Sequence, residues 1–198
     1  MTKVIDYYVS LVSPFTYLGS RRLEEIAERR GADIRVKPVD FSVIFPKTGG
    51  LPLAKRAPQR QAYRLVELRR WSERLDMPLN LHPQHFPAPE AMAACLVLAV
   101  EATGGDPLRL AHAILRAVWA EERDIADSAT LDAIAHETGH VGQDLMDKVL
   151  NPETRARYEA LTEEALGRGV FGAPTFVFND ELFWGQDRLD FLDQALAA

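Results

Sequence analysis

Strand-forming sequence in this chain is confined to its two ends, and this feature constrains the fold more than any other. Residues 3–9 and 34–39 are short segments rich in β-branched and aromatic side chains, and residues 175–184 hold two more such segments. Between the two ends, about a hundred residues carry apolar side chains mostly at helical spacing. A sheet in this chain must therefore be assembled from segments at opposite ends of the sequence.

The two ends of the chain predict complementary halves of that sheet. Pro14 opens a segment in which apolar residues recur at helical spacing, and Gly31 ends it. With a strand on either side, this is a β-α-β unit, in which a crossover helix joins two parallel strands. The end of the chain predicts β-β-α, with a tight turn at residues 179–180 and a final helix over residues 187–197.

The middle of the chain is predicted to be helical. Helices are expected over residues 61–75, 89–101, 107–122, 128–137, 142–150 and 152–168. Before them, residues 46–61 hold three prolines and two glycines, which predicts a loop or a domain junction. The element order predicts an α/β protein with a thioredoxin-like β-α-β/β-β-α sheet domain and a large all-helical insertion. The sheet domain is expected to comprise residues 1–45 and 169–198, and the insertion residues 46–168.

Composition narrows the functional classes. The chain has 198 residues and a net charge of −6, and an acidic protein lacks the general basic surface that binds nucleic acid or anionic membranes. No apolar segment is long enough for a signal peptide or a membrane span, so we expect a soluble cytoplasmic protein. The single cysteine, Cys95, excludes an internal disulfide and a cysteine-cluster zinc site, and it is interpreted as a small buried residue.

The segment Ser13-Pro14-Phe15-Thr16 lies where the first predicted strand meets the first helix. Ser13 is a typical helix N-cap and Pro14 a typical first helical residue, so capping alone explains both. In a thioredoxin fold, however, this junction holds the redox Cys-x-x-Cys pair, and here its two positions are Ser13 and Thr16. The site therefore cannot exchange disulfides. A hydroxyl and a helix N-terminus remain, and they can lower the pKa of a thiol carried by a ligand.

Two further motifs flank the C-terminal strands. Ala173-Pro174 precedes the first of them, where thioredoxin folds carry a cis-proline, and a cis bond there would present a backbone edge to an extended peptide beside Ser13. A plain strand entry through a trans proline is the alternative. Gln186 and Asp187 follow the second strand, and they predict either a capped helix start or two polar groups for the charged end of a small peptide.

Histidines in the middle of the chain carry weaker signals. Residues 136–140, His-Glu-Thr-Gly-His, match the HExxH pattern of zinc proteins. Gly139 indicates that the helix is ending, and no third ligand is evident downstream, so no metal site is predicted. His82 and His85 could line the mouth of a pocket, but solvated loop histidines explain them at least as well.

Four motifs in the right order resemble the 2-hydroxychromene-2-carboxylate isomerase family. They are residues 13–18, 119–125, 170–175 and 184–188, and the resemblance covers essentially the whole chain. The family belongs to the DsbA-like thioredoxin superfamily and is close to kappa-class glutathione transferases. The resemblance implies a homodimer with glutathione as cofactor, and it implies a glutathione site made of Ser13, Phe15, Ala173, Pro174, Gln186 and Asp187.

The resemblance also implies a role for individual residues of that site. Ser13 matches the serine that hydrogen-bonds the glutathione sulfur. Ala173 matches the residue before the cis-proline, whose backbone pairs with the cysteinyl part of glutathione. Gln186 and Asp187 match the pair that holds the γ-glutamyl end.

The substrate side departs from the family pattern at two positions. Phe45 stands where the naphthalene-pathway isomerase has a substrate-binding lysine, and Gly50 stands where relatives carry an asparagine near glutathione. Lys47, Lys55 or Arg56 could take the place of that lysine, although a solvated basic loop explains them equally well.

The function implied by the resemblance is a glutathione-dependent isomerase of aromatic catabolism. Its reaction interconverts 2-hydroxychromene-2-carboxylate and trans-o-hydroxybenzylidenepyruvate. Reversible addition of the glutathione thiolate to the conjugated double bond would leave a single bond free to rotate, with Ser13 as the catalytic residue that stabilises the thiolate. Two alternatives use the same site: a kappa-like glutathione transferase, and a redox-inactive thioredoxin-fold module that binds peptides.

Overall fold

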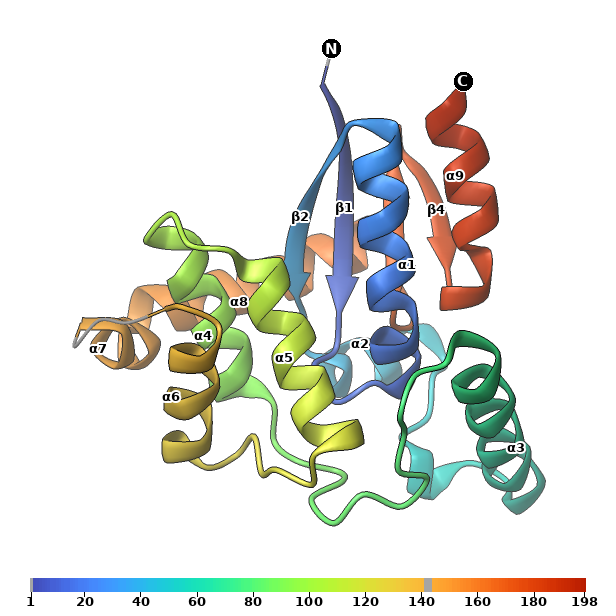
Figure 1. The fold of residues 1–198 in the computed structure, drawn as a ribbon, viewed down its shortest axis with the longest axis horizontal. Helices are drawn as coiled ribbons and strands as arrows, with labels where there is room; N and C mark the ends of the chain where they lie inside the picture. Colours follow the sequence, from blue (N-terminus) through green and yellow to red (C-terminus); the bar gives the residue numbers. More distant parts are fainter. Residues whose placement is uncertain (1, 141–143) are drawn as a thin grey trace.

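The computed structural model describes residues 2–140 and 144–198, and its centre is one mixed sheet (Figure 1). The sheet has the order β2-β1-β3-β4, and its strands are β1 (Lys3–Val9), β2 (Ala32–Pro38), β3 (Thr175–Phe178) and β4 (Glu181–Trp184). β1 is parallel to β2 and antiparallel to β3, and β3 is antiparallel to β4. The predicted β-α-β and β-β-α halves therefore form a single sheet from the two ends of the chain.

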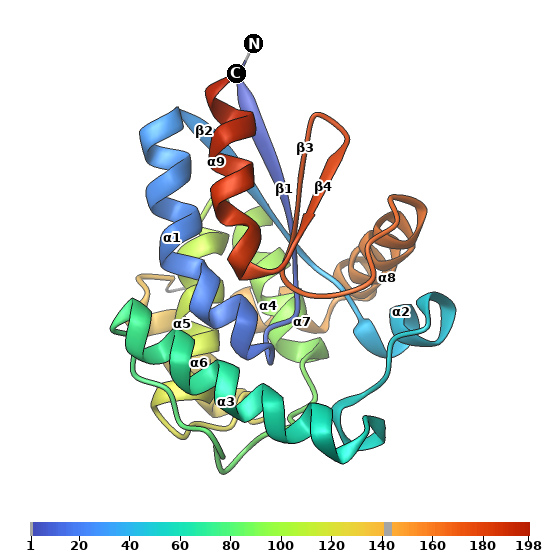
Figure 2. The same ribbon diagram turned by 90° about the vertical axis from the view of Figure 1, so that its right-hand side faces the viewer.

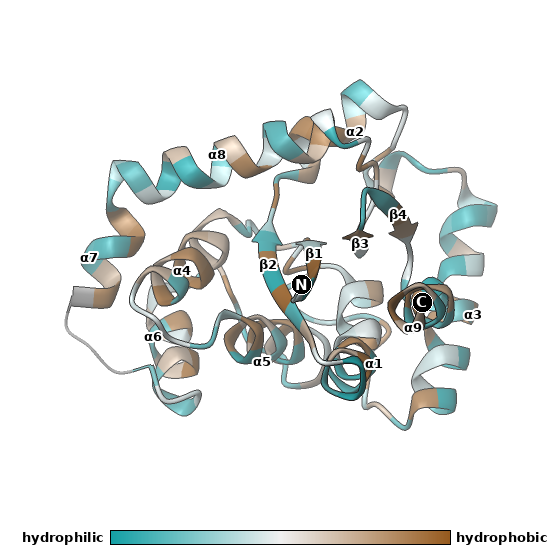
Figure 3. Ribbon diagram, turned by 90° about the horizontal axis from the view of Figure 1, so that it is seen from above, coloured by the Kyte–Doolittle hydropathy of each residue, from teal (hydrophilic) through white to brown (hydrophobic). Residues whose placement is uncertain are grey.

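Helices cover both faces of this sheet (Figures 1 and 3). α1 (Pro14–Arg30) and α9 (Leu189–Ala197) pack on one face, and α8 (Pro152–Gly167) packs on the other. Successive residues of β1 contact opposite faces, as expected for a strand. Tyr7 belongs to the apolar cluster of the α1 face, whereas Tyr8 belongs to the cluster that includes α8.

The other helices extend the molecule beyond the sheet. α4 (Ala91–Ala102), α5 (Pro107–Ala120), α6 (Ser128–Glu137) and α7 (Asp144–Leu150) pack together on the side of β2. α4 is buried continuously over residues 93–100, and Figure 3 shows it as more hydrophobic than α8. α3 (Pro58–Leu75) instead crosses the N-terminal end of α1 (Figure 2). No helix of the described residues has the length and hydropathy to cross a membrane.

The segment from residue 46 to residue 61 is more regular than the sequence predicted. α2 spans Phe41–Thr48 and contains Pro46, and a 3-10 turn, η1, spans Leu53–Lys55. α3 then begins at Pro58, three residues before its predicted start. The loop prediction was therefore wrong at both ends of this segment.

Capping and packing explain why these prolines do not prevent helix formation. Asp40 caps α2 by accepting a hydrogen bond from the Ser42 N–H at 2.8 Å. Phe41 and Ile44 are buried in the apolar cluster on the α8 side of the sheet. Pro58 occupies the first turn of α3, where its missing N–H removes no intrahelical hydrogen bond.

Two other predicted helix starts have different outcomes. The start predicted at Gly142 lies outside the described residues, and the described part of that helix is α7. The start predicted at Asp187 is a 3-10 turn, η2 (Gln186–Arg188), which precedes α9. Asp187 makes no capping hydrogen bond, because the cap positions of η2 and α9 are Gly185 and Arg188, and its carboxylate contacts Arg188 at 2.7 Å within the turn.

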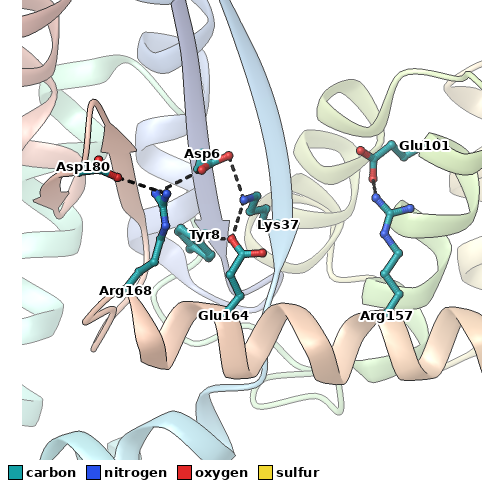
Figure 4. A network of polar contacts seen from close by, with 8 residues as sticks. All are labelled: Asp6, Tyr8, Lys37, Glu101, Arg157, Glu164, Arg168 and Asp180. Atoms are coloured by element: carbon teal, nitrogen blue, oxygen red, sulfur yellow. Dashed lines mark hydrogen bonds and ion pairs between the residues drawn. The ribbon is translucent and has the colours of Figure 1, made fainter.

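A polar network joins α8 to the sheet (Figure 4). Lys37 on β2 contacts Asp6 Oδ1 at 2.9 Å and Glu164 Oε1 at 2.7 Å, and the Tyr8 hydroxyl donates to the same Glu164 oxygen at 2.5 Å. Burial alone would raise the pKa of Glu164, but the hydrogen bonds from Lys37 and Tyr8 outweigh it and hold that pKa below its ordinary value. Arg168 extends the network to Asp6 at 3.4 Å.

Candidate functional site

Ser13 ends the loop between β1 and α1 and caps the helix. Its Oγ accepts a hydrogen bond from the Thr16 N–H at 3.3 Å, and the residue is half-buried. The unpaired N–H groups of the first turn and the helix dipole make this end of α1 favourable for a negative charge. Thr16 is fully buried, and its Oγ1 has no hydrogen-bond partner among the described residues.

A carboxylate supports the loop that leads to Ser13. Glu90, at the start of α4, accepts hydrogen bonds from the Ser10 hydroxyl at 2.9 and 3.0 Å and from the Leu11 N–H at 2.5 Å. Burial raises the pKa of Glu90 to about 7, although these hydrogen bonds favour its ionised form. Sequence reasoning missed Glu90, because no local pattern indicates that residue 90 contacts residues 10 and 11.

The Ala173–Pro174 peptide bond is cis. The Pro174 carbonyl accepts a hydrogen bond from the Gly185 N–H at 2.9 Å, which fixes this loop to the start of η2. Within the described ranges, no residue hydrogen-bonds the backbone N–H or C=O of Ala173. Ala173 therefore presents an available donor and acceptor directly before the strand, as an extended peptide ligand requires.

A cleft of about 240 Å³ brings several predicted site residues together. Phe15, Ala173, Gln186 and Asp187 line it. Ser13 and Pro174 are close to these residues in the chain but are not part of the lining. The cleft is completed by Trp184, Gly185 and Arg188, which belong to the motif at residues 184–188 but had no predicted role, and by Glu67 and Trp71, which sequence reasoning did not identify.

The missed residues of α3 had a partial signal in the sequence. Glu67 and Trp71 are four residues apart in a predicted helix, so they lie on the same helix face. Nothing in the sequence, however, indicated that this face of α3 is directed at the start of α1.

Gln186 is a buried polar residue of the cleft. It is 2% exposed, and its Oε1 has no hydrogen-bond partner in the part of the chain that is described. It packs on Gly19 of α1, where a Cβ would lie 2.9 Å from the Gln186 Cβ. A buried polar atom without a partner costs about 1–3 kcal/mol, so a ligand that donates a hydrogen bond to this oxygen would be stabilised.

Two residues predicted for the substrate side lie outside this cleft and have local partners. Phe45 is half-buried on α2 and packs against Phe41, with 5.4 Å between the ring centroids. Its ring also covers Gly50, where a Cβ would lie 2.3 Å from the Phe45 Cδ1. Lys47 is exposed and contacts Glu163 of α8 at 3.1 Å.

The other two predicted substrate residues belong to the segment before α3. Lys55 is exposed in η1. Arg56 is half-buried, and its Nε donates to the Leu51 carbonyl at 2.8 Å. The structure therefore does not bring the four predicted substrate residues together in one place.

The segment with the HExxH pattern contains the end of α6. The helix ends at Glu137, so His140 lies beyond it, and the His140 Nε2 is 3.2 Å from the Asp106 carbonyl oxygen. Across residues 2–140 and 144–198, no three side chains of the metal-ligating types gather at one point.

Comparisons with known proteins agree with the thioredoxin-like fold described above. The model of the DSBA-like thioredoxin domain matches residues 4–197. The chain is 32% identical to the 2-hydroxychromene-2-carboxylate isomerase of Sphingobium xenophagum over 99% of both chains. It is 29% identical to the isomerase of the same name from Pseudomonas putida, over 98% of this chain and 94% of the other.

Solved structures are also similar to this chain in fold. A structure of 2-hydroxychromene-2-carboxylate isomerase superposes with a TM-score of 0.83 at 27% identity, over 98% of this chain and 94% of the other. The cytosolic disulfide reductase DsbM from Pseudomonas aeruginosa shares the fold, with a TM-score of 0.70 at 21% identity over 98% of each chain.

The fold and the site together define a DSBA-like thioredoxin-domain protein, which confirms the predicted fold class. Ser13 and Thr16 at the strand–helix junction distinguish it from thioredoxin folds that exchange disulfides. The chain belongs to the 2-hydroxychromene-2-carboxylate isomerase family, as its motifs predicted.

Proposed function

We propose that the protein is a glutathione-dependent isomerase that interconverts 2-hydroxychromene-2-carboxylate and trans-o-hydroxybenzylidenepyruvate type compounds in aromatic catabolism. One observation carries the proposal: Phe15, at the start of α1, shares a cleft with Ala173, which precedes the cis-proline. The names of the full-length relatives support the isomerase activity.

The cleft residues fit a small peptide that carries a thiol. The backbone N–H and C=O of Ala173, which have no partner among the described residues, suit the extended cysteinyl part of such a peptide. The buried Gln186 Oε1 suits a donor such as the amino group of the γ-glutamyl end. Ser13 can donate its hydroxyl proton to a sulfur while its Oγ accepts from the Thr16 N–H, because a hydroxyl has both capacities.

Glutathione bound here would supply a thiolate that adds reversibly to the conjugated double bond of the substrate, so that rotation occurs about a single bond. The Ser13 hydroxyl would stabilise the negative sulfur by a hydrogen bond, and the N-terminus of α1 would stabilise it through the helix dipole. Both effects lower the pKa of a thiol from its ordinary value of about 8.5. Ser13 is therefore the proposed catalytic residue.

Replacing the hydroxyl of Ser13 tests this proposal. In Ser13→Ala we expect kcat/KM for glutathione-dependent isomerisation to fall about a hundredfold, the usual effect of removing one donor to a reacting anion. The pKa of bound glutathione, followed by the ultraviolet absorbance of its thiolate, should rise in parallel. Full activity in this variant, or isomerisation by the wild-type protein without glutathione, would contradict the mechanism.

A matched control separates catalysis from helix capping. Asn151-Pro152 repeats the Ser13-Pro14 arrangement at the start of α8, where the Asn151 Oδ1 accepts from the Glu153 N–H at 2.9 Å. Asn151→Ala should lose about 1 kcal/mol of stability, as other lost caps do, with unchanged activity. Mass spectrometry of the product completes the test, because a stable glutathione conjugate would identify a transferase instead.

A further inference from the structure

A second cavity, of about 290 Å³, lies along the same helix as the candidate site. Gln61 and Arg64 of α3 line this cavity, whereas Glu67 and Trp71 of α3 line the cleft described above. With a rise of 1.5 Å per residue, Arg64 and Trp71 are roughly 10 Å apart along the helix axis. Figure 2 shows α3 passing the N-terminal end of α1, and residues of this one helix line both the cavity and the cleft.

Arg64 is a cation without an anionic partner in this cavity. Its guanidinium carbon lies 5.4 Å from the Phe86 ring centroid and 5.6 Å from the Trp119 ring centroid. Burial lowers the pKa of Arg64 to about 10, and the nearby charge of Arg56 adds to this effect. Arg64 is therefore still protonated at neutral pH. None of the ion pairs among the described residues includes Arg64 or Arg56.

Two carboxylates on the elements around the cavity already have partners. Glu67, one turn along α3 from Arg64, accepts from Arg70 at 2.8 Å. Glu122 accepts hydrogen bonds from the Asn80 side chain at 2.6 Å and from the Gln84 N–H at 2.5 Å. Asn80 and Gln84 belong to the loop that forms the opposite wall of the cavity. The positive charge of Arg64 is consequently left for a ligand.

The physical consequence is a preference for an anion. Two like charges in a partly buried site repel each other, and the aromatic faces of Phe86 and Trp119 offset only part of the desolvation of Arg64. A carboxylate would neutralise this charge and could form two parallel hydrogen bonds with the planar guanidinium.

We propose that Arg64, reinforced by the charge of Arg56, binds the carboxylate of the aromatic substrate. The inference rests on the proposed function, because both the chromene and its ring-opened partner carry a carboxylate. Leu53, Leu81 and Phe86 provide an apolar wall for the carbon skeleton next to the guanidinium. Arg56 itself does not line the cavity, but Gln61, which does, donates a hydrogen bond to the Arg56 carbonyl at 2.7 Å.

A matched pair of ligands tests the subsite without turnover. trans-Benzylidenepyruvate has the enone and the carboxylate but lacks the ring hydroxyl needed for ring closure, and benzylideneacetone has a methyl group in place of the carboxylate. Calorimetry on the full-length wild-type protein should show the acid binding at least about tenfold more tightly than the ketone. Equal affinities would overturn the proposal.

A variant of Arg64 assigns that preference to its guanidinium. Arg64→Met keeps an unbranched side chain against Phe86 and Trp119, and it should abolish the preference for the acid. The KM for the substrate should rise about ten- to a hundredfold, with the KM for glutathione unchanged. Arg69→Met removes the same charge from an exposed position of α3 outside the cavity, and it should change neither value.

The outcomes separate this inference from the proposed function. Glutathione also carries carboxylates, and a rise in its KM alone would assign Arg64 to glutathione and overturn the substrate assignment. A protein that prefers the acid through Arg64 but does not isomerise would contradict the proposed function and leave the subsite intact. If Arg64→Met does not give a native circular dichroism spectrum, equal affinities of the wild-type protein for the two ligands still overturn the proposal.

Discussion

Glu90 is a single residue that the native fold makes harder to ionise. Burial, together with the negative charge of Asp40, raises its pKa from 4.5 to about 7 despite its hydrogen bonds to Ser10 and Leu11. Between these two pH values the native state binds more protons than the unfolded state. The stability that this group contributes is therefore fully present below about pH 4.5 and is lost as the pH rises through about 7.

Glu90→Gln should remove this part of the pH dependence. Between about pH 5 and about pH 8, we expect the wild-type free energy of unfolding to fall by about 2–3 kcal/mol relative to the variant, as measured by urea titration. Burial lowers the pKa of His112 to about 4, which acts in the opposite sense, but His112 is present in both proteins and cancels in the difference. A difference that does not change with pH would refute this role of Glu90.

At the scale of elements, the candidate site depends on the close approach of η2 to α1. Gly19→Ala places a Cβ only 2.9 Å from the Gln186 Cβ, so the 3-10 turn must move away from the helix. We expect about tenfold weaker glutathione binding by calorimetry, and no gain in stability although alanine favours a helix by about 1 kcal/mol. Gly167→Ala is the control, because its Cβ would meet no atom within 4 Å. Unchanged glutathione affinity in Gly19→Ala would argue against this site.

The helix ends show which structural features a local sequence pattern can predict. Ser13 caps α1 and Gly31 ends it at a φ of 61°, as predicted, because caps and left-handed turns depend on neighbouring residues. Pro46 and Pro58 were misinterpreted as parts of a loop. Pro58 suits the first turn of α3, whereas Pro46 lies inside α2, where it costs an intrahelical hydrogen bond that the packing of Phe41 and Ile44 offsets. The composition of residues 46–61 reveals neither position.

Lys37 links the two ends of the fold, because it joins the N-terminal strands to α8. Its side chain is 14% exposed, and Lys37→Met would leave Asp6 and Glu164 without their shared cation. We expect the free energy of unfolding to fall by about 2 kcal/mol in urea titrations, less than for a fully buried pair. Lys47→Met breaks an exposed pair with Glu163 and should change stability little. Equal losses in the two variants would show that the network adds nothing beyond a surface pair.

The residues alone were enough to predict the order of the strands and of most helices, the capped helix start at Ser13 and the absence of cysteines from the redox positions. Each depends on the identity of a residue or of its near neighbours. Three features are known only from the folded chain: the bond before Pro174 is cis, Gln186 packs on Gly19, and Arg64 contacts Phe86 and Trp119. Such contacts join residues far apart in the chain, and the packing of helices and loops sets their geometry, which spacing along the sequence does not encode.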